Sequence, residues 1–250
     1  MKMQSAKNKY TAKQVLNSYI RKKFDEEIQE MWGVVVFYRW ISIIITPLFI
    51  RASIAPTKVT LFSLLLTLSQ PVCLLLETPA SYLYLGIICY VFNILDCVDG
   101  DIARTTDTYS RLGQYSDFQV DVAHRIMTYI TLGLLLQLQP DTIVPVLQHY
   151  ALLIASIACL LAVGARLSRL YVAVTFNTLN TVTKQTKNPS FIVKLEKAIF
   201  SFLSGLDFCL PVLILIAGIF DKLPWLLIWL LIYSTMDFIY TQYTNYFNLR

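Results

Sequence analysis

Four aspartates occupy regular positions on either side of a short polar break in an otherwise apolar part of the 250-residue chain. Asp96 and Asp99 lie three residues apart before the break, and Asp117 and Asp121 lie four residues apart after it. On helices, these spacings place each pair on one face. The connection between the two helices is short, so we expect them to be antiparallel neighbours. The four carboxylates would then converge near the ends that the connection joins.

Carboxylates clustered in an apolar environment need a compensating charge. Without one they would repel one another and lose their solvation. Divalent cations remove both costs, and grouped hard oxygen ligands suit Mg²⁺ or Mn²⁺, which in turn bind phosphates. The spacing therefore favours a metal-phosphate site. A carboxylate-lined pathway for cations or protons and a purely structural role remain as alternatives.

Small residues occupy the same two helical faces as the aspartates: Gly100, Ala103 and Gly113. Such residues permit close approach of helices, or let a flat ligand press against the backbone. Arg104 follows directly and could contact a phosphate. Two further acids, Asp101 and Asp107, fall off the shared face, and we expect neither to take part in the chemistry.

The composition predicts a membrane protein of several spans, because 56% of the residues are hydrophobic and only 15% are charged. A soluble domain of this length would be far more polar. The net charge of +5 could suggest a nucleic-acid partner. However, the positions of the charges follow membrane topology, so we expect no nucleic acid to bind.

Six stretches have the roughly 20 mainly apolar residues that a membrane-spanning helix needs. They cover residues 57–77, 81–103, 112–138, 143–165, 199–219 and 224–243. Lys and Arg concentrate in the segments on the same side as the break between the aspartate pairs, which the positive-inside rule makes cytoplasmic. The sequence thus predicts an all-α, multi-pass membrane domain over residues 56–250, with the aspartates on the cytoplasmic side.

An amphipathic segment precedes the six stretches. Apolar residues recur at helical spacing over residues 16–32, which predicts a helix lying on the cytoplasmic membrane surface or docking on protein. Residues 34–50 are apolar, but Arg39 and Pro47 interrupt them, and a seventh span would disturb the charge asymmetry. We therefore assign residues 1–55 to cytoplasmic amphipathic and juxtamembrane helices.

The spacing of residues 96–121 resembles the signature of the CDP-alcohol phosphotransferase (CDP-alcohol phosphatidyltransferase) family. That signature is D-x-x-D-G-x-x-A-R, eight residues, then G-x-x-x-D-x-x-x-D, and all eight fixed positions match. The family often opens its first span with P-N-x-x-T. Residues 56–60 read P-T-K-V-T, so Thr57 replaces the asparagine. The six-span plan with a cytoplasmic site also agrees with the family.

The resemblance implies transfer of a phosphoryl-alcohol group, commonly phosphatidyl, from a CDP-linked donor to an alcohol acceptor, with release of CMP, in phospholipid or related polar-lipid biosynthesis. It implies Mg²⁺ or Mn²⁺, as two ions, held by Asp96, Asp99 and Asp117. Asp121 would lie near the second ion and act as general base. Five residues would form the cytidine-diphosphate pocket: Thr60, Gly100, Ala103, Arg104 and Gly113.

The resemblance also implies which partners the protein binds, and it helps to weigh the alternative function of a transporter. The partners would be the CDP-linked donor, the alcohol acceptor and membrane lipids, and a homodimer is compatible because family members are often dimers. A carboxylate-lined cation or proton transporter is the alternative of a different class. Such a transporter would not need the spacing of Gly100, Ala103, Arg104 and Gly113.

Several charged residues outside the signature are candidates for the acceptor side. His124 could face the acceptor, and Arg125 could pair with Asp121. Asp207 and Asp237 could each pair with a basic residue or help form the acceptor pocket. The sequence does not fix which alcohol is the acceptor, or whether the donor is CDP-diacylglycerol.

Two arginines stand one turn apart at the end of the fourth apolar stretch, Arg166 and Arg169. They could anchor the helix in anionic head groups. In family members that accept a phosphorylated alcohol, basic residues in this region hold the acceptor phosphate, and two arginines with this spacing suit that use. Both functions remain open from the sequence.

Overall fold

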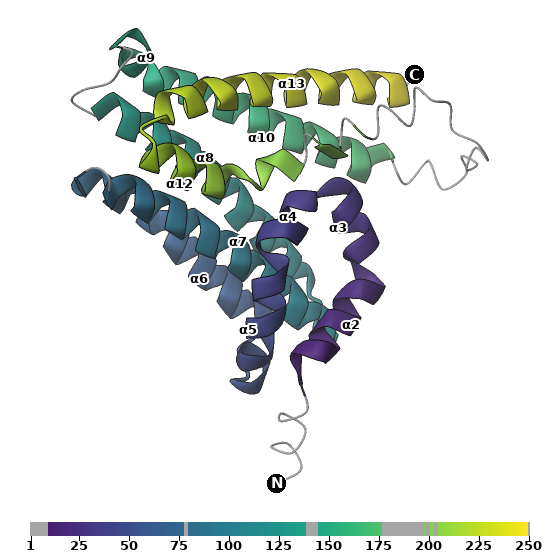
Figure 1. Cartoon of the computed structure of the whole chain (residues 1–250). Helices are drawn as coiled ribbons and strands as arrows, with labels where there is room; N and C mark the ends of the chain where they lie inside the picture. The colour runs from purple at the N-terminus through teal and green to yellow at the C-terminus, as the bar shows by residue number, and fades with distance from the viewer. Residues whose placement is uncertain are drawn as a thin grey trace.

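The computed structural model describes residues 10–77, 80–138, 145–176, 198, 201–202 and 205–249, and every regular element in these residues is helical (Figure 1). The prediction of an all-α chain is confirmed. The helices, in chain order, are α2 (Ala12–Lys22), α3 (Phe24–Glu30), α4 (Trp32–Phe37), α5 (Arg39–Arg51), α6 (Pro56–Ser69), the 3₁₀ helix η1 (Gln70–Leu75), α7 (Ala80–Thr106), α8 (Arg111–Leu138), α9 (Pro145–His149), α10 (Ala151–Phe176), α12 (Leu210–Ile219) and α13 (Leu223–Leu249).

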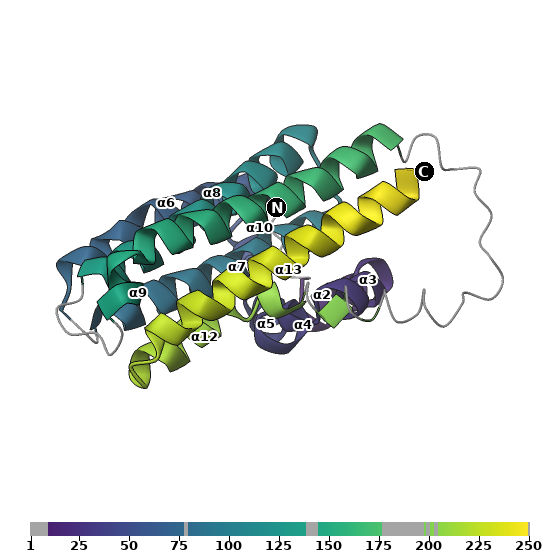
Figure 2. The same cartoon turned by 90° about the horizontal axis from the view of Figure 1, so that it is seen from above.

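The long helices form a bundle in which α10 packs against both α8 and α13, and α6 packs against both α7 and α8 (Figure 2). The shorter α12 lies along α7. Small residues set a close contact between α8 and α10, where a Cβ added to Gly133 would lie 2.6 Å from the Cβ of Ala155. Such contacts let the helix backbones pack closely where side chains would otherwise separate them.

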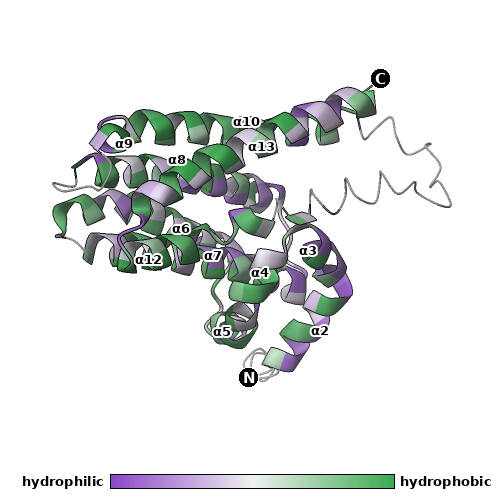
Figure 3. Ribbon diagram, turned by 45° about the horizontal axis from the view of Figure 1, so that its top comes forward, coloured by the Kyte–Doolittle hydropathy of each residue, from purple (hydrophilic) through white to green (hydrophobic). Residues whose placement is uncertain are grey.

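Four of the described helical segments are long and apolar enough to cross a membrane: Pro56–Leu75, Ala80–Thr106, Ala151–Phe176 and Leu223–Phe247. Apolar side chains cover much of the outer surface of the bundle, whereas α2 and α3 are more polar (Figure 3). Helix α8 has 28 residues but carries the charges of Asp117, Asp121 and Arg125, and α12 has only 10 residues. Four of the six predicted spans therefore coincide with candidate membrane-spanning helices, and the other two remain predictions.

Two of the predicted stretches have different boundaries in the structure. The fourth was placed at residues 143–165, and its first residues lie outside the described part of the chain. Its long helix α10 begins at Ala151 and continues beyond residue 165, past Arg166 and Arg169, to Phe176. The fifth, placed at residues 199–219, is interrupted by a turn at Phe208 and Cys209 before α12 begins. Pro211 lies in the first turn of α12, where its missing N–H costs no hydrogen bond, so the sequence there favours a new helix start.

The N-terminal helices dock on protein. Helix α2 packs against α5 and α7, and its apolar side chains Val15 and Tyr19 are buried there. A capping box between Thr11 and Gln14 fixes the start of α2. Helix α5 has 13 residues, which is shorter than the roughly 20 residues that a span requires. The sequence left two positions open for the amphipathic helix, on the membrane surface or against protein. In the structure the helix packs against protein.

The connection between α7 and α8 is short and has well-defined ends. Asp107 adopts a left-handed backbone conformation with φ 52°, and the amide of Thr108 donates to the Ala103 carbonyl at 3.1 Å, which ends α7. Ser110 caps α8 because its hydroxyl accepts a hydrogen bond from the Gly113 amide at 2.9 Å. These two ends bring the second half of the signature back beside the first.

Candidate functional site

Three of the four predicted carboxylates converge. Asp96 and Asp99 on α7 and Asp117 on α8 present oxygen atoms that all lie within 4.8 Å of one another. Asp99 is 7% exposed, and the other two are half-buried. We call these residues the carboxylate triad. Within the described part of the chain, no lysine or arginine forms an ion pair with any of the three.

The triad therefore fits a divalent cation by the chemistry of its donors. Hard carboxylate oxygens at this separation match the preference of Mg²⁺ and Mn²⁺. Their charge is not balanced by a paired cationic side chain, and grouped, partly buried carboxylates repel one another unless a cation lies among them. Thr60 also orders the group, because its hydroxyl donates to Asp99 Oδ2 at 2.7 Å.

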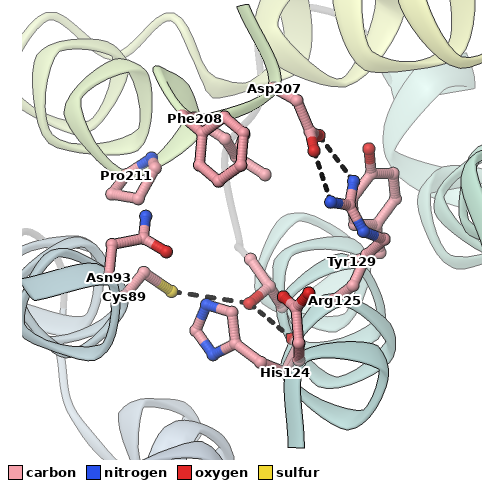
Figure 4. A pocket seen from close by; sticks show the side chains of 11 residues that line it. Cys89, Asn93, His124, Arg125, Tyr129, Asp207, Phe208 and Pro211 are labelled. Atoms are coloured by element: carbon pink, nitrogen blue, oxygen red, sulfur yellow. Dashed lines mark hydrogen bonds and ion pairs between the residues drawn. The ribbon is translucent and has the colours of Figure 1, made fainter. Parts of the chain in front are cut away.

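Asp121 lies one turn beyond Asp117 on α8 and is not part of the triad. Its carboxylate forms an ion pair with Arg166 of α10. The predicted pair between Arg125 and Asp121 is wrong, because both guanidinium Nη atoms of Arg125 donate to the two carboxylate oxygens of Asp207 (Figure 4). This two-bond geometry satisfies both groups better than a single bond along one helix would.

A pocket of about 330 Å³ adjoins the triad at the cytoplasmic end predicted for α7 and α8. It brings together all five residues that the sequence assigned to the nucleotide, and two members of the triad line it as well. Its other lining residues come from the turn between α2 and α3, from the start of α6, from the α7–α8 connection and from the start of α8. The full lining is Lys23, Pro56, Thr57, Thr60, Asp99, Gly100, Ala103, Arg104, Thr108, Tyr109, Ser110, Gly113, Gln114 and Asp117.

Two glycines of the signature leave room that a side chain would fill. A Cβ on Gly100 would lie 3.0 Å from both Nη atoms of Arg104, because the guanidinium folds back across this position. A Cβ on Gly113 would lie 2.9 Å from the Ser110 hydroxyl that caps α8. Arg104 Nε is buried and has no hydrogen-bond partner among the described residues.

Sequence reasoning missed several residues of this pocket. Tyr109, Ser110 and Gln114 lie in or next to the α7–α8 connection, and their closeness to the signature was the signal that could have indicated them. Lys23 lies between α2 and α3, far away along the chain, and only the docking of α2 places it at the pocket. Asp101 and Asp107 lie outside the triad, as predicted.

A second, smaller pocket of about 40 Å³, which Asp121 helps to line, lies between α7, α8 and the segment that leads into α12 (Figure 4). A volume of this size holds one or two waters or a small polar group. Polar side chains and an apolar rim both contribute to it. The lining residues are Cys89, Asn93, Asp121, His124, Arg125, Thr128, Tyr129, Asp207, Phe208, Leu210 and Pro211.

His124 lines this second pocket but is held by its neighbours. Its ring stacks on Phe92 with centroids 3.5 Å apart. Its Nδ1 atom lies 2.9 Å from Gln70 Nε2 and 3.3 Å from the Thr67 hydroxyl. The ring is 8% exposed, so only a limited part of it could reach an acceptor.

The two predicted acceptor arginines have different surroundings. Arg166 reaches Asp121, and its guanidinium lies 5.8 Å from the Phe118 ring centroid, so it belongs to the site. Arg169 instead donates to Asp237 of α13 at 2.7 Å and to the Thr241 hydroxyl at 2.7 Å. Arg169 thus ties α10 to α13 and lies beyond the residues that line the two pockets.

The fold and this site define a class: a multi-pass membrane protein with a group of carboxylates beside a pocket formed by an arginine and small residues. A family model for CDP-alcohol phosphatidyltransferases matches residues 53–236, which is most of the chain. The chain therefore belongs to this family of transferases, whose members generally depend on divalent metals. A search among curated proteins found no match.

Proposed function

We propose that the protein transfers a phosphoryl-alcohol group, in the first instance phosphatidyl, from a CDP-linked donor to an alcohol acceptor and releases CMP. Membership of the family supports this class of reaction. The observation that carries the proposal for this chain is the carboxylate triad, which borders a pocket lined by Thr60, Gly100, Ala103, Arg104 and Gly113.

The pocket is proposed to hold the cytidine diphosphate of the donor. Gly100 leaves room for the Arg104 guanidinium to lie on the pocket wall, and Arg104 there offers a fixed positive charge to a phosphate. Gly113 lines the same pocket without a side chain that would fill it. Thr60 keeps Asp99 oriented through its hydrogen bond. The triad would hold Mg²⁺ or Mn²⁺, with Asp121 near a second ion, and such ions neutralise charge on a diphosphate.

Asp121 is proposed to act as general base. Its carboxylate takes the proton from the acceptor hydroxyl, whose oxygen forms the new bond to phosphorus as the bond from phosphorus to the CMP oxygen breaks. Arg166 pairs with Asp121 and so fixes the direction in which its carboxylate points. Because Asp121 also lines the second pocket, the acceptor hydroxyl is proposed to approach from that side.

The remaining acceptor contacts are proposed on the same basis. Arg166 and His124 lie within reach of Asp121 or its pocket, whereas Arg169 also holds Asp237 of α13, so its contact with the acceptor would use the guanidinium donors that this pair leaves over. We propose in addition that α8 and the segment containing α12 complete six spans, with the site on the cytoplasmic side. An acyl-bearing donor could then keep its tails in lipid while its head group enters the pocket.

Release of CMP by the purified full-length chain tests this function. With CDP-diacylglycerol, a panel of polar alcohols and Mg²⁺ or Mn²⁺, we expect CMP and a new lipid for at least one acceptor. Chelation should abolish CMP release, and added Mn²⁺ or Mg²⁺ should restore it. Asp96→Asn should lose both metal binding and turnover. Absence of CMP release with every CDP-alcohol, from a protein shown to be folded, would overturn the proposal, and coupled ion flux in vesicles would favour the transporter.

A further inference from the structure

The end of α7 that carries Arg104 is held by helices that lie before the family-matched region. The match begins at residue 53, whereas α2 to α5 end at Arg51. Ser18 and Lys22 of α2 both donate to the Arg104 carbonyl, at 3.2 Å and 2.8 Å. Lys22 also pairs with Asp107 at 2.7 Å. Hydrogen bonds from α2, which lies outside the family-matched region, thus hold the backbone of Arg104.

The side chain of Arg104 is held by the same helices through Asp101. Arg104 Nη2 donates to Asp101 Oδ1 at 2.9 Å, and Arg39 Nη1 of α5 donates to the same oxygen at 3.0 Å. The Ser42 hydroxyl donates to the other oxygen, Oδ2, at 2.9 Å. Asp101 is only 1% exposed, so these three donors define its position almost completely.

The network of ion pairs extends through Arg39 to Glu27 of α3. Both Nε and Nη2 of Arg39 donate to the Glu27 carboxylate, and the guanidinium lies 4.6 Å from the Tyr19 ring centroid. Burial and the nearby Glu27 carboxylate raise the pKa of Tyr19, so the ring stays neutral beside the arginine. Glu27 and Arg39 are each 3% exposed. Two acids and two arginines therefore form one buried, charge-balanced network that ends at the pocket.

A buried network of charged side chains adds little to the stability of the fold. Buried ion pairs lose solvation, and well-packed apolar residues often stabilise a fold as well or better. What the network does supply is a fixed place for the Arg104 guanidinium, which folds across Gly100 on the pocket wall. Because the donors converge on Asp101, a shift of α5 relative to α7 would move Arg104.

We propose that Asp101, supported by Arg39 and Glu27, is a positioning residue that holds Arg104 in the geometry that binds the CDP-linked donor, and that the N-terminal helices are in this way part of the donor site. The inference rests on the proposed function in so far as Arg104 contacts the donor. Asp101 itself touches neither the substrate nor the carboxylate triad.

A double-mutant cycle tests the proposal, with two readouts on the full-length chain in detergent: equilibrium binding of CDP-diacylglycerol in the presence of Mn²⁺, and kcat and KM for CMP release. Asp101→Asn should raise the donor Kd and KM about tenfold while kcat changes less than about threefold. Arg104→Ala should also weaken binding, and adding Asp101→Asn to it should cause no further loss, because coupled residues are not additive.

A matched control separates positioning from loosened packing. Tyr90 of α7 donates to the Phe37 carbonyl of α4 at 2.8 Å, so Tyr90→Phe removes a contact between α7 and the same N-terminal helices without touching Asp101. It should leave donor Kd unchanged. If Asp101→Asn fails to fold, Ser42→Ala removes one donor to Asp101 without changing charge, and it should raise Kd about threefold.

Additive losses in the double mutant, or an Asp101→Asn protein with wild-type Kd, would overturn the positioning role. Equal loss of binding in Tyr90→Phe would do the same. The failure of the proposed function looks different: the wild-type chain would bind the donor without releasing CMP, and the cycle could still be measured on Kd. A wild-type chain that binds no CDP-linked donor would overturn both.

Discussion

Asp121 differs from the other three aspartates of the signature in its partner. It is paired with Arg166, whereas the triad of Asp96, Asp99 and Asp117 has no ion-paired arginine or lysine among the described residues. The ion pair with Arg166 holds the Asp121 carboxylate apart from the triad. The unpaired group suits metal ligation. The local contacts thus support different tasks for chemically identical side chains.

Asp121→Asn should separate turnover from binding. The amide cannot accept the acceptor proton, so kcat should fall by roughly 100-fold or more, while the donor Kd stays within about threefold of wild type because the triad and the pocket remain. Product formation and donor binding, measured on one preparation, check this. Asp117→Asn is the matched comparison, and it should weaken Mn²⁺ and donor binding together. Normal turnover by Asp121→Asn would exclude it as the base.

Gly100→Ala should act on the donor through Arg104. The added methyl would lie 3.0 Å from both Nη atoms of the guanidinium, so the arginine must move away from its place on the pocket wall. We expect donor KM to rise about tenfold with stability nearly unchanged. Gly164→Ala is the control, since its methyl meets only the Phe238 ring at 3.3 Å, away from the pocket. An unchanged KM in Gly100→Ala would mean that Arg104 does not contact the donor.

At the scale of elements, partly buried ion pairs join helices whose own sequences do not fix their relative position. Arg125 links α8 to the segment before α12, and Arg169 links α10 to α13. Each pair places a charged group of one element beside an opposite charge of another. The pocket next to Asp121 keeps its shape through the first of these links.

Removing one partner of the Arg125–Asp207 pair should therefore destabilise the bundle. Both side chains are about 15% exposed, and breaking a buried pair costs roughly 3–5 kcal/mol because the other charge is left unpaired. Arg125→Gln or Asp207→Asn should lower the free energy of unfolding by this order, as measured by thermal unfolding in detergent. The double variant should recover part of the loss.

Asp107→Asn removes the exposed ion pair between Lys22 and Asp107, and it serves as the comparison for loss of the Arg125–Asp207 pair. Asp107 is 77% exposed, and surface pairs contribute at most about 1 kcal/mol. Asparagine also tolerates the left-handed backbone at this position. The substitution should have little effect on unfolding. A loss as large as that of Asp207→Asn would contradict the distinction between buried and exposed pairs.

At the scale of the whole molecule, the proposed topology depends on α8. This helix carries the second half of the signature and runs from Arg111, beside the donor pocket, to Leu138 at the opposite end of the bundle, near α9. Its charges lie in its first half, next to partners and the carboxylate triad. If α8 crosses the membrane, the donor pocket and α9 face opposite sides.

Single-cysteine labelling tests this arrangement. All five native cysteines are buried and free, so they can be replaced or left unreactive. Leu112 at the pocket end of α8 and His149 at the end of α9 are both exposed. An impermeant maleimide should label His149→Cys in intact cells and Leu112→Cys only after permeabilisation. The opposite pattern would invert the proposed orientation, and labelling of both from one side would mean that α8 does not span the membrane.

Local spacing was enough to predict the helices and the grouping of the aspartates, and the family resemblance added five residues that line the neighbouring pocket. The reason is that residues three or four positions apart share a helical face whatever the helix packs against. The short α7–α8 connection then brings the two halves together. The sequence also determined the family, because the signature lies within one continuous stretch of 26 residues, 96–121.

Only the tertiary structure decided the partners of the charged residues. Arg125 forms an ion pair with Asp207 and not with Asp121, which is nearer along the chain. Asp121 pairs with Arg166, and the buried Asp101 pairs with Arg39. These choices depend on which helices pack together and in what rotation, and no periodicity within one helix contains that information. For the same reason the sequence left open whether the N-terminal amphipathic helix lies on the membrane surface or docks on protein. Its packing on α7 makes it a neighbour of the pocket beside the triad.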